Sequence, residues 1–262
     1  MNSIQIVYPS DLLHATMPDE NFAQEYQQAQ QSGIHCLLLS SEAAALGKYR
    51  FSTTFNADIP VIWRGWMMDK DEYQQLYQAV DKQGVHLLTS VDAYLNCHHL
   101  VGWYSLCQSF TPKTVIVSAD ADFDTLVKQL QWPAYFVKDY VKSLTTTRGS
   151  VAHDAKEIQE VINLLKQYRG QIEGGICLRH FEHFDQQSER RYFVLKGQVY
   201  SSDNHIPMLV TEIAKRIESP FFTIDMAIND AGELRLIEIG DGQVSDIKEW
   251  SVERFVQILN SL

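Results

Sequence analysis

The stretch LRLIEIGDGQVSD, Leu234 to Asp246, begins as an apolar strand and breaks into a run of glycines and acids. It follows the apolar segment FFTIDMAI (221–228) and the turn residues NDAG (229–232), and together they form the clearest hairpin signal in the chain. If Ile228 pairs with Glu233, Asp225 lies opposite Leu236. Period-2 alternation then places Asp225 and Glu238 on the same face of the hairpin.

Two carboxylates on one face of a buried hairpin need a positive partner. As diagonal neighbours they would be about 7 Å apart, and like charges that face an interior repel each other and are costly to desolvate. Magnesium at a nucleotide site uses a few hard oxygen ligands, completed by water and phosphate. Gly240 and Gly242 allow the backbone to turn sharply beside a ligand. The hairpin therefore predicts a magnesium site, and the alternative is that these acids are exposed or paired with Lys or Arg.

The composition excludes some classes of partner. The chain has 262 residues, of which 45% are hydrophobic, so it can form one large domain or two ordinary ones. Its 22 basic and 33 acidic residues give a net charge of −11, and no basic block is visible, so we expect neither nucleic acid nor membrane as a partner. The start, MNSIQIVYPSD, lacks a basic segment followed by a long apolar run. We expect a cytoplasmic protein.

The cysteines stand singly at positions 36, 97, 107 and 177, which favours reduced thiols. The run Cys97-His98-His99 could suggest zinc. Adjacent residues rarely point at one metal, however, and no second ligand pair has the spacing of a zinc finger, so buried or half-buried side chains are favoured.

The first half of the chain alternates short apolar runs with polar helical segments. Strands are expected at 4–9, 35–40, 59–63 and 85–90, and a helix at 71–84. This alternation is typical of a parallel α/β layer. Arg64 follows the third of these strands, where α/β proteins tend to place ligand sites, although it could equally stack on a neighbouring tryptophan.

After TPKT (111–114) the pattern changes toward longer strands and hairpins, so we place a domain boundary near residue 110. The prediction is an α/β domain with a parallel sheet at 1–110 and an α+β domain at 111–262. In the second domain, Asp154 and Glu157 have the spacing of a helix-start capping pair, and Gly170 ends that helix. The segment ICLRHF (176–181) predicts a strand, and Lys196-Gly197 marks a second hairpin.

The order of these elements resembles the ATP-grasp superfamily, whose members bind ATP between two α+β subdomains. The resemblance covers about residues 110–250, and the first half is similar to the smaller α/β domain that precedes the grasp. Three motifs, WRGWMM (63–68), VKDYVKS (137–143) and EIGDGQVS (238–245), look like the clade named for two arginines and a lysine.

The resemblance implies a role for each matching position. Lys138 would contact the ATP phosphates, the linker Leu178, Arg179, His180 and Phe181 would meet adenine, and Glu182 would bind the ribose. Arg191 would face the phosphates, with Lys142 and Arg64 as further candidate catalytic residues. Asp225, Glu238 and Asp241 would hold Mg²⁺. The chain departs from the family at Gly240-Asp241, where Glu-x-Asn is usual, and at SLTTTRGS (143–150), which replaces a glycine-rich loop.

The activity implied by the resemblance is ATP-dependent ligation. A carboxylate, from a small molecule or a peptide, would be phosphorylated and the acyl phosphate coupled to an amine. Two alternatives stay open: a nucleotide-binding module without turnover, and a structural α/β protein. On the plainest interpretation Lys138 is an ordinary strand lysine whose stem lies along apolar surface.

Overall fold

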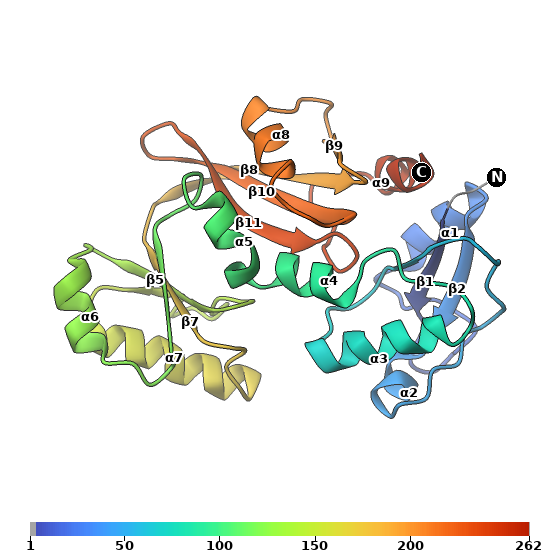
Figure 1. Cartoon of the computed structure of the whole chain (residues 1–262), viewed down its shortest axis with the longest axis horizontal. Coiled ribbons are helices and arrows are strands. Elements are labelled where there is room, and N and C mark those ends of the chain that lie inside the picture. The colour runs from blue at the N-terminus through green and yellow to red at the C-terminus, as the bar shows by residue number, and fades with distance from the viewer. Residues whose placement is uncertain (1–3, 262) are drawn as a thin grey trace. The chain divides into compact units, whose positions relative to one another are not determined.

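The computed structural model describes residues 4–261. Its strands are β1 (Gln5–Pro9), β2 (His35–Leu39), β3 (Val61–Trp63), β4 (Thr114–Val117), β5 (Tyr135–Asp139), β6 (Val151–Ala152), β7 (Ile176–His180), β8 (Phe184–Leu195), β9 (Gln198–Tyr200), β10 (Phe221–Asn229) and β11 (Leu234–Asp241). Its helices are α1 (Ala23–Gln31), α2 (Ser41–Ala45), α3 (Lys70–Asp81), α4 (Val91–His98), α5 (Leu100–Cys107), α6 (Phe123–Leu130), α7 (Ala155–Arg169), α8 (Met208–Ala214) and α9 (Val252–Leu259). Figure 1 shows these elements in colour from the N-terminus to the C-terminus.

The chain divides into two compact units. Unit 1 comprises Met1–Leu95, Arg191–Ile224 and Gly240–Leu262, and unit 2 comprises Asn96–Arg190 and Asp225–Ile239. The long strands β8, β10 and β11 each contribute residues to both units. The domain boundary that the sequence predicts near residue 110 stays a proposal.

Unit 1 contains the parallel α/β layer expected from the sequence. Its three-stranded sheet has the order β2-β1-β3, and both outer strands run parallel to β1. Side chains alternate between two cores, because one face of β1 (Ile6, Tyr8) joins the cluster that includes Phe255 of α9, and the other face (Val7) joins the cluster that includes Leu76 of α3. The helix expected at 71–84 is α3, which begins at a complete capping box.

The prediction of a strand at 85–90 is wrong. The segment makes a single parallel bridge, Val61↔Leu87, in which Val61 N donates to His86 O and Leu88 N donates to Val61 O. The next two residues form hydrogen bonds outside a strand ladder. The carbonyl of Thr89 accepts a hydrogen bond from the Tyr73 hydroxyl, and the hydroxyl of Ser90 accepts one from the backbone at the start of α4.

Unit 2 contains a four-stranded antiparallel sheet with the order β4-β7-β5-β6. One face carries Tyr135, Val137 and Leu178 and packs against α7 through a shared apolar cluster. Figure 1 shows α6 and α7 together beside β5 and β7. Because side chains alternate along strands, the residues between them, including Lys138, lie on the opposite face.

Local sequence signals are confirmed in both units. Asp154 caps α7 by accepting a hydrogen bond from the Glu157 backbone, and Gly170 ends the helix with φ 77°. The hairpin between β8 and β9 in unit 1 also turns where expected, with Lys196 at φ 47° and Gly197 at φ 80°. Both positive φ values are those of a type I′ turn, which glycine favours.

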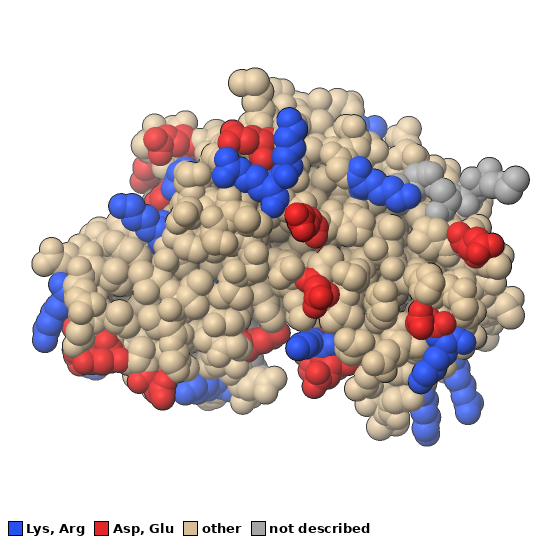
Figure 2. All heavy atoms as spheres, viewed as in Figure 1, with Lys and Arg blue, Asp and Glu red and all other residues tan. Residues whose placement is uncertain are grey.

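No helix within the described residues is both long enough and apolar enough to cross a membrane. Charges of both signs are interspersed on the face shown in Figure 2, where Lys and Arg side chains lie among Asp and Glu side chains. The four cysteines are buried thiols.

Candidate functional site

Unit 2 contains a cavity of about 550 Å³. Phe136 of β5 and Arg179 of β7 line one side, on the face of the sheet that α7 leaves uncovered. Ala227 of β10 and Ile237 of β11 line another side. The segment from His180 to Gln186 completes most of the lining. The cavity therefore lies between the antiparallel sheet and the end of the hairpin that the sequence singled out.

Lys138 lies on the same face as the cavity lining. It pairs with Cys177 across the β5–β7 ladder, and Phe136 pairs with Arg179, so these four side chains project from one side of the sheet. The side chain of Lys138 is 6% exposed, and its Nζ donates to Glu238 Oε1 at 2.7 Å. This ion pair joins residues 100 positions apart in sequence.

The register of the β10–β11 hairpin differs from the expected one by a residue. Asn229, and not Ile228, pairs with Glu233, because Asn229 N donates to Glu233 O at 3.0 Å. This register differs by one residue from the predicted one, which paired Asp225 with Leu236. At the far end of the hairpin Gly242 N donates to Phe221 O, so the register shifts by one more residue along the strands. The expected register was wrong because Asn229 and Gly232 close the turn themselves: Gly232 N donates to Asn229 O, and Gly232 has φ 78°.

Glu238 nevertheless reaches the cavity side. Ile237 lines the cavity and the adjacent Glu238 contacts Lys138, so two consecutive residues of β11 turn toward the same side. Regular alternation forbids this arrangement, whereas a β-bulge permits it. Asp225 is two residues from Ala227, which also lines the cavity, and so projects from the same face. Asp225 is buried and Glu238 is half-exposed, and both belong to unit 2.

Arg179 is a site residue whose side chain the sequence did not single out. Its Nη1 donates to Ile237 O at 3.0 Å and its Nη2 donates to Thr111 Oγ1 at 2.7 Å. Burial lowers its pKa, and the carboxylate of Glu238 opposes that shift. Its Nε is buried and has no acceptor among the described residues. The strand ICLRHF alone could not show which of its faces would meet the hairpin.

The side chains of the expected adenine linker alternate between the two faces of the sheet. Leu178 and His180 pair with Val137 and Tyr135 on the face that α7 covers, whereas Arg179 projects from the other face. His180 and Phe181 also border the cavity. The backbone N–H of Phe181 donates to Ala134 O, and that of His180 donates to Lys113 O. These two donors are therefore already engaged within the sheet.

Glu182 lines the cavity and is held firmly. Its two carboxylate oxygens accept from Nε and Nη2 of Arg235, each at 3.1 Å, and Asn229 Nδ2 lies 3.3 Å from Oε2. Such a two-point contact fixes the carboxylate in one orientation.

His98 is a second residue that the sequence did not mark. It is buried in unit 2, and burial lowers its pKa to about 4, with the charge of His99 acting in the same direction. The carboxylates of Glu173 and Glu238 oppose this shift. Beside it, His99 Nε2 lies 2.9 Å from Glu173 Oε1.

Lys142 lies just beyond β5, in the turn that follows Lys138. Its backbone N–H donates to Asp139 Oδ1 and its carbonyl accepts from Asp139 N, while the residue itself is exposed. The structure thus leaves the ammonium group of Lys142 at the surface of unit 2.

The other expected catalytic residues lie in unit 1. Arg64 is buried, its Nε donates to Glu25 Oε1 at 2.8 Å, and its Nη1 donates to the carbonyls of Gln243 and Ser245. Arg191 Nη1 donates to Asp246 Oδ1 at 3.0 Å. Both arginines therefore hold the segment that follows β11.

Asp241 belongs to the same polar network in unit 1. Its Oδ1 accepts from the backbone N and the Nε2 of Gln243, which also donates to the Tyr73 hydroxyl. Its Oδ2 is buried and has no hydrogen-bond partner among the described residues. Burial raises the pKa of Asp241 to about 7. Three positions separate it from Glu238, and its carboxylate is turned into this network.

Within the described residues, no three His, Cys, Asp or Glu side chains gather closely enough to hold a metal ion by themselves. Magnesium at a nucleotide site needs only one or two carboxylates, because water and phosphate supply the other oxygens. Asp225 and Glu238 provide that donor set on the cavity side of unit 2. The residues therefore fit magnesium carried in with a nucleotide.

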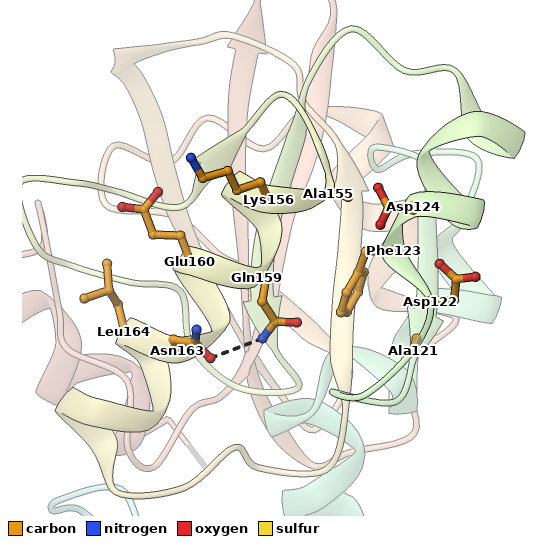
Figure 3. Close-up of a pocket in the computed structure, with 10 residues that line it drawn as sticks. All are labelled: Ala121, Asp122, Phe123, Asp124, Ala155, Lys156, Gln159, Glu160, Asn163 and Leu164. Atoms are coloured by element: carbon orange, nitrogen blue, oxygen red, sulfur yellow. Dashed lines mark hydrogen bonds between the residues drawn. The ribbon is translucent and has the colours of Figure 1, made fainter.

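A second hollow in unit 2 has no comparable chemistry. Figure 3 shows a groove between α6 and α7, with Phe123 turned into it and Gln159 bonded to Asn163. Its Asp122 caps α6 by accepting from Thr125 N. Both helices lie on the face opposite Lys138, so this groove is separate from the candidate site.

A family model described as an ATP-grasp domain, family 3 of the clade named for two arginines and a lysine, matches residues 74–259. No curated protein matches the sequence. Among solved structures, the chain is similar to the ATP-grasp ligase PsnB in complex with a minimal precursor, with 12% identity, a TM-score of 0.64, and 99% of each chain covered.

Two other solved structures show the same fold. The D-cycloserine synthetase DcsG has 12% identity, a TM-score of 0.62, and 98% of each chain covered. The RimK domain protein ATP-grasp from Sphaerobacter thermophilus has 11% identity and a TM-score of 0.63, with 98% of this chain and 97% of that chain covered.

Proposed function

Because the chain belongs to family 3 of this clade of ATP-grasp domains, we propose that it is a magnesium-dependent ligase that uses ATP to join a carboxylate to an amine. The observation that carries this proposal is the Lys138–Glu238 ion pair beside the cavity of unit 2. It brings a lysine and a carboxylate together on the face of the sheet from which Phe136 and Arg179 line the cavity. The aromatic lining at Phe136 and Phe181 suits a purine base, and the charged pair on the same face suits the phosphates.

The charged residues of the site have separate roles in this proposal. Lys138 binds phosphate oxygens, and the orphaned Nε of Arg179 offers a further donor on the same face. Glu182, oriented by Arg235, accepts hydrogen bonds from the ribose hydroxyls. Lys142 lies at the surface of unit 2, where its ammonium group can neutralise the charge that develops on the transferred phosphoryl group.

Asp225 and Glu238 would hold magnesium together with the nucleotide. The bound ion neutralises phosphate charge and aligns the oxygens for displacement. Glu238, which contacts Lys138 in this structure, would be a ligand of the ion, and Lys138 would contact the phosphate. We assign Asp241, Arg64 and Arg191 to the support of the segment after β11, because their partners hold that segment within unit 1.

The proposed reaction has two steps. A substrate carboxylate oxygen attacks the terminal phosphorus of ATP, and ADP leaves as an acyl phosphate forms. An amine then attacks the acyl carbon, inorganic phosphate leaves, and the amine gives up a proton. Neither step needs a nucleophilic side chain, so a site made of cations and metal ligands suffices. Peptides and amino acids are both suitable substrates; the ligase PsnB was solved with a precursor.

The test is ADP formation with magnesium-ATP and a panel of amino acids and short peptides, with hydroxylamine added to trap an acyl phosphate as a hydroxamate. We expect ADP release that depends on the carboxylate and yields a hydroxamate of matching mass. Arg179→Ala should lower the rate at least tenfold because a phosphate contact is lost. Binding of ATP with no ADP release for any acid would support the rival function, a nucleotide-binding module without turnover.

A further inference from the structure

Several large apolar side chains are exposed at the edge of the unit 1 sheet where its parallel strands end. Large side chains are exposed in the loops that follow all three strands: Leu12 (70%), Leu13 (82%) and Met17 (57%) after β1, Leu46 (74%) after β2, and Trp66 (47%) and Met67 (38%) after β3. Exposed apolar residues scattered singly are ordinary, whereas a group at one edge marks a binding surface. The order β2-β1-β3 also makes this edge the one at which α/β proteins bind ligands.

A cavity of about 210 Å³ opens at this edge. It is lined by Leu39 at the end of β2, Trp63 at the end of β3, and the side chains of Tyr49, Trp66 and Met67. All of its lining residues belong to unit 1. It is distinct from the cavity of unit 2 that the proposed function uses.

Most of the lining offers carbon and sulfur surfaces to a ligand, with the buried Ser41 Oγ, which has no hydrogen-bond partner among the described residues, as a polar exception. The indole N–H of Trp63 donates to Trp66 O, and that of Trp66 donates to Asp19 Oδ2. The carboxylate of Glu72 accepts from Asp69 N in the capping box of α3. These indole and carboxylate groups are therefore engaged.

Arg64, which follows Trp63 of the lining, is buried against Glu25 and is therefore not available to a ligand carboxylate. Lys48 and Arg50, which flank Tyr49 of the lining, are exposed and do not line the cavity. The chemistry of the cavity favours an apolar group over a charged one.

The size of the cavity selects the group. A cavity of about 150 Å³ lined by apolar side chains accommodates one benzene molecule. At about 210 Å³, this one accommodates a phenyl ring together with its methylene. Aromatic side chains and a methionine are also the surroundings that a phenyl ring favours, through edge contacts and sulfur contacts.

We propose that this cavity binds the aromatic side chain of an amino acid or peptide. The assignment of that molecule as the substrate of the ligase rests on the proposed function, whereas the binding itself does not. The exposed residues around the cavity would then contact the neighbouring part of the same molecule.

The test is a titration of the full-length protein with N-acetyl-phenylalanine amide, followed by tryptophan fluorescence without nucleotide. N-acetyl-alanine amide is the matched probe without the ring. We expect saturable binding of the phenylalanine probe, and binding of the alanine probe at least tenfold weaker. Met67→Ala should weaken the phenylalanine probe several-fold. Met208→Ala is the matched control, because Met208 is 89% exposed in unit 1 and does not line the cavity.

Equal affinity for the two probes, or unchanged affinity in folded Met67→Ala, would overturn the proposal. Folding of each variant is checked by its melting temperature and circular dichroism. The results distinguish failure of the proposed ligase activity from failure of the proposed aromatic site. Probe binding without carboxylate-dependent ADP release contradicts only the ligase, and ADP release with no discrimination between the probes contradicts only the aromatic site.

Discussion

Asp241 shows at the residue scale how burial changes the character of an acid. The sequence placed it beside Gly240 as a possible third magnesium ligand, and the structure surrounds it with Gln243 and Tyr73. Burial raises its pKa to about 7 from 3.8, so the folded state favours the protonated form. The sequence could not reveal this environment, because the contact between Tyr73 and Gln243 joins residues 170 positions apart.

A pH dependence follows from the raised pKa of Asp241. Between about pH 4 and pH 7 the folded state binds a proton that the unfolded state releases, so the free energy of unfolding falls as pH rises through this window. Asp241→Asn removes that slope, worth a few kcal/mol at most. In urea denaturation at pH 4 to 8, the free energy of unfolding of the variant should rise relative to that of the wild type as pH rises, and the difference should be constant above pH 7. A difference that does not change with pH would contradict the raised pKa of Asp241. Asp58→Asn, at an exposed position, is the control.

At the element scale, short-range signals predicted the structure well. The Asp154–Glu157 pair, Gly170 and the Lys196-Gly197 turn act within a few residues, and all are confirmed. Features that depend on distant partners were not predictable. The segment 85–90 does not form a strand, because the carbonyl of Thr89 bonds to Tyr73 and the hydroxyl of Ser90 bonds to the first turn of α4. The hairpin register is a local feature that the prediction missed, because Asn229 and Gly232 close the turn one residue later than expected.

The cap of α7 gives a test at this scale. Asp154 Oδ1 accepts from Glu157 N at 2.8 Å, and without it the first turn of the helix loses a partner. Asp154→Ala should lower the free energy of unfolding by about 1 kcal/mol. The exposed Lys156→Ala in the same helix should change it by less than about 0.5 kcal/mol. Equal midpoints for the two variants in urea, followed by far-UV circular dichroism, would show that the cap contributes little.

At the scale of the whole molecule, the candidate site depends on topology. The sheet of unit 2 leaves one face free of α7, and the hairpin of β10 and β11 brings Glu238 to Lys138 across 100 positions. The sequence identified the hairpin acids and Lys138 through a family resemblance, but not their contact. Composition and periodicity do not specify which strand face meets which distant element. The sequence therefore placed Arg179 only in the adenine linker, without its side-chain contacts to the hairpin, and did not mark His98.

Calorimetric titration with magnesium-ATP tests whether the cavity of unit 2 binds the nucleotide through Lys138. We predict saturable binding to the wild type and a loss of about 10- to 100-fold in Lys138→Ala, because a charged hydrogen bond contributes about 1.5–3 kcal/mol. Lys156→Ala, on the α7 side that Figure 3 shows, should bind as the wild type does. Equal affinity of the wild type and folded Lys138→Ala would show that Lys138 does not bind the nucleotide, and no binding by the wild type would show that this cavity is not an ATP site.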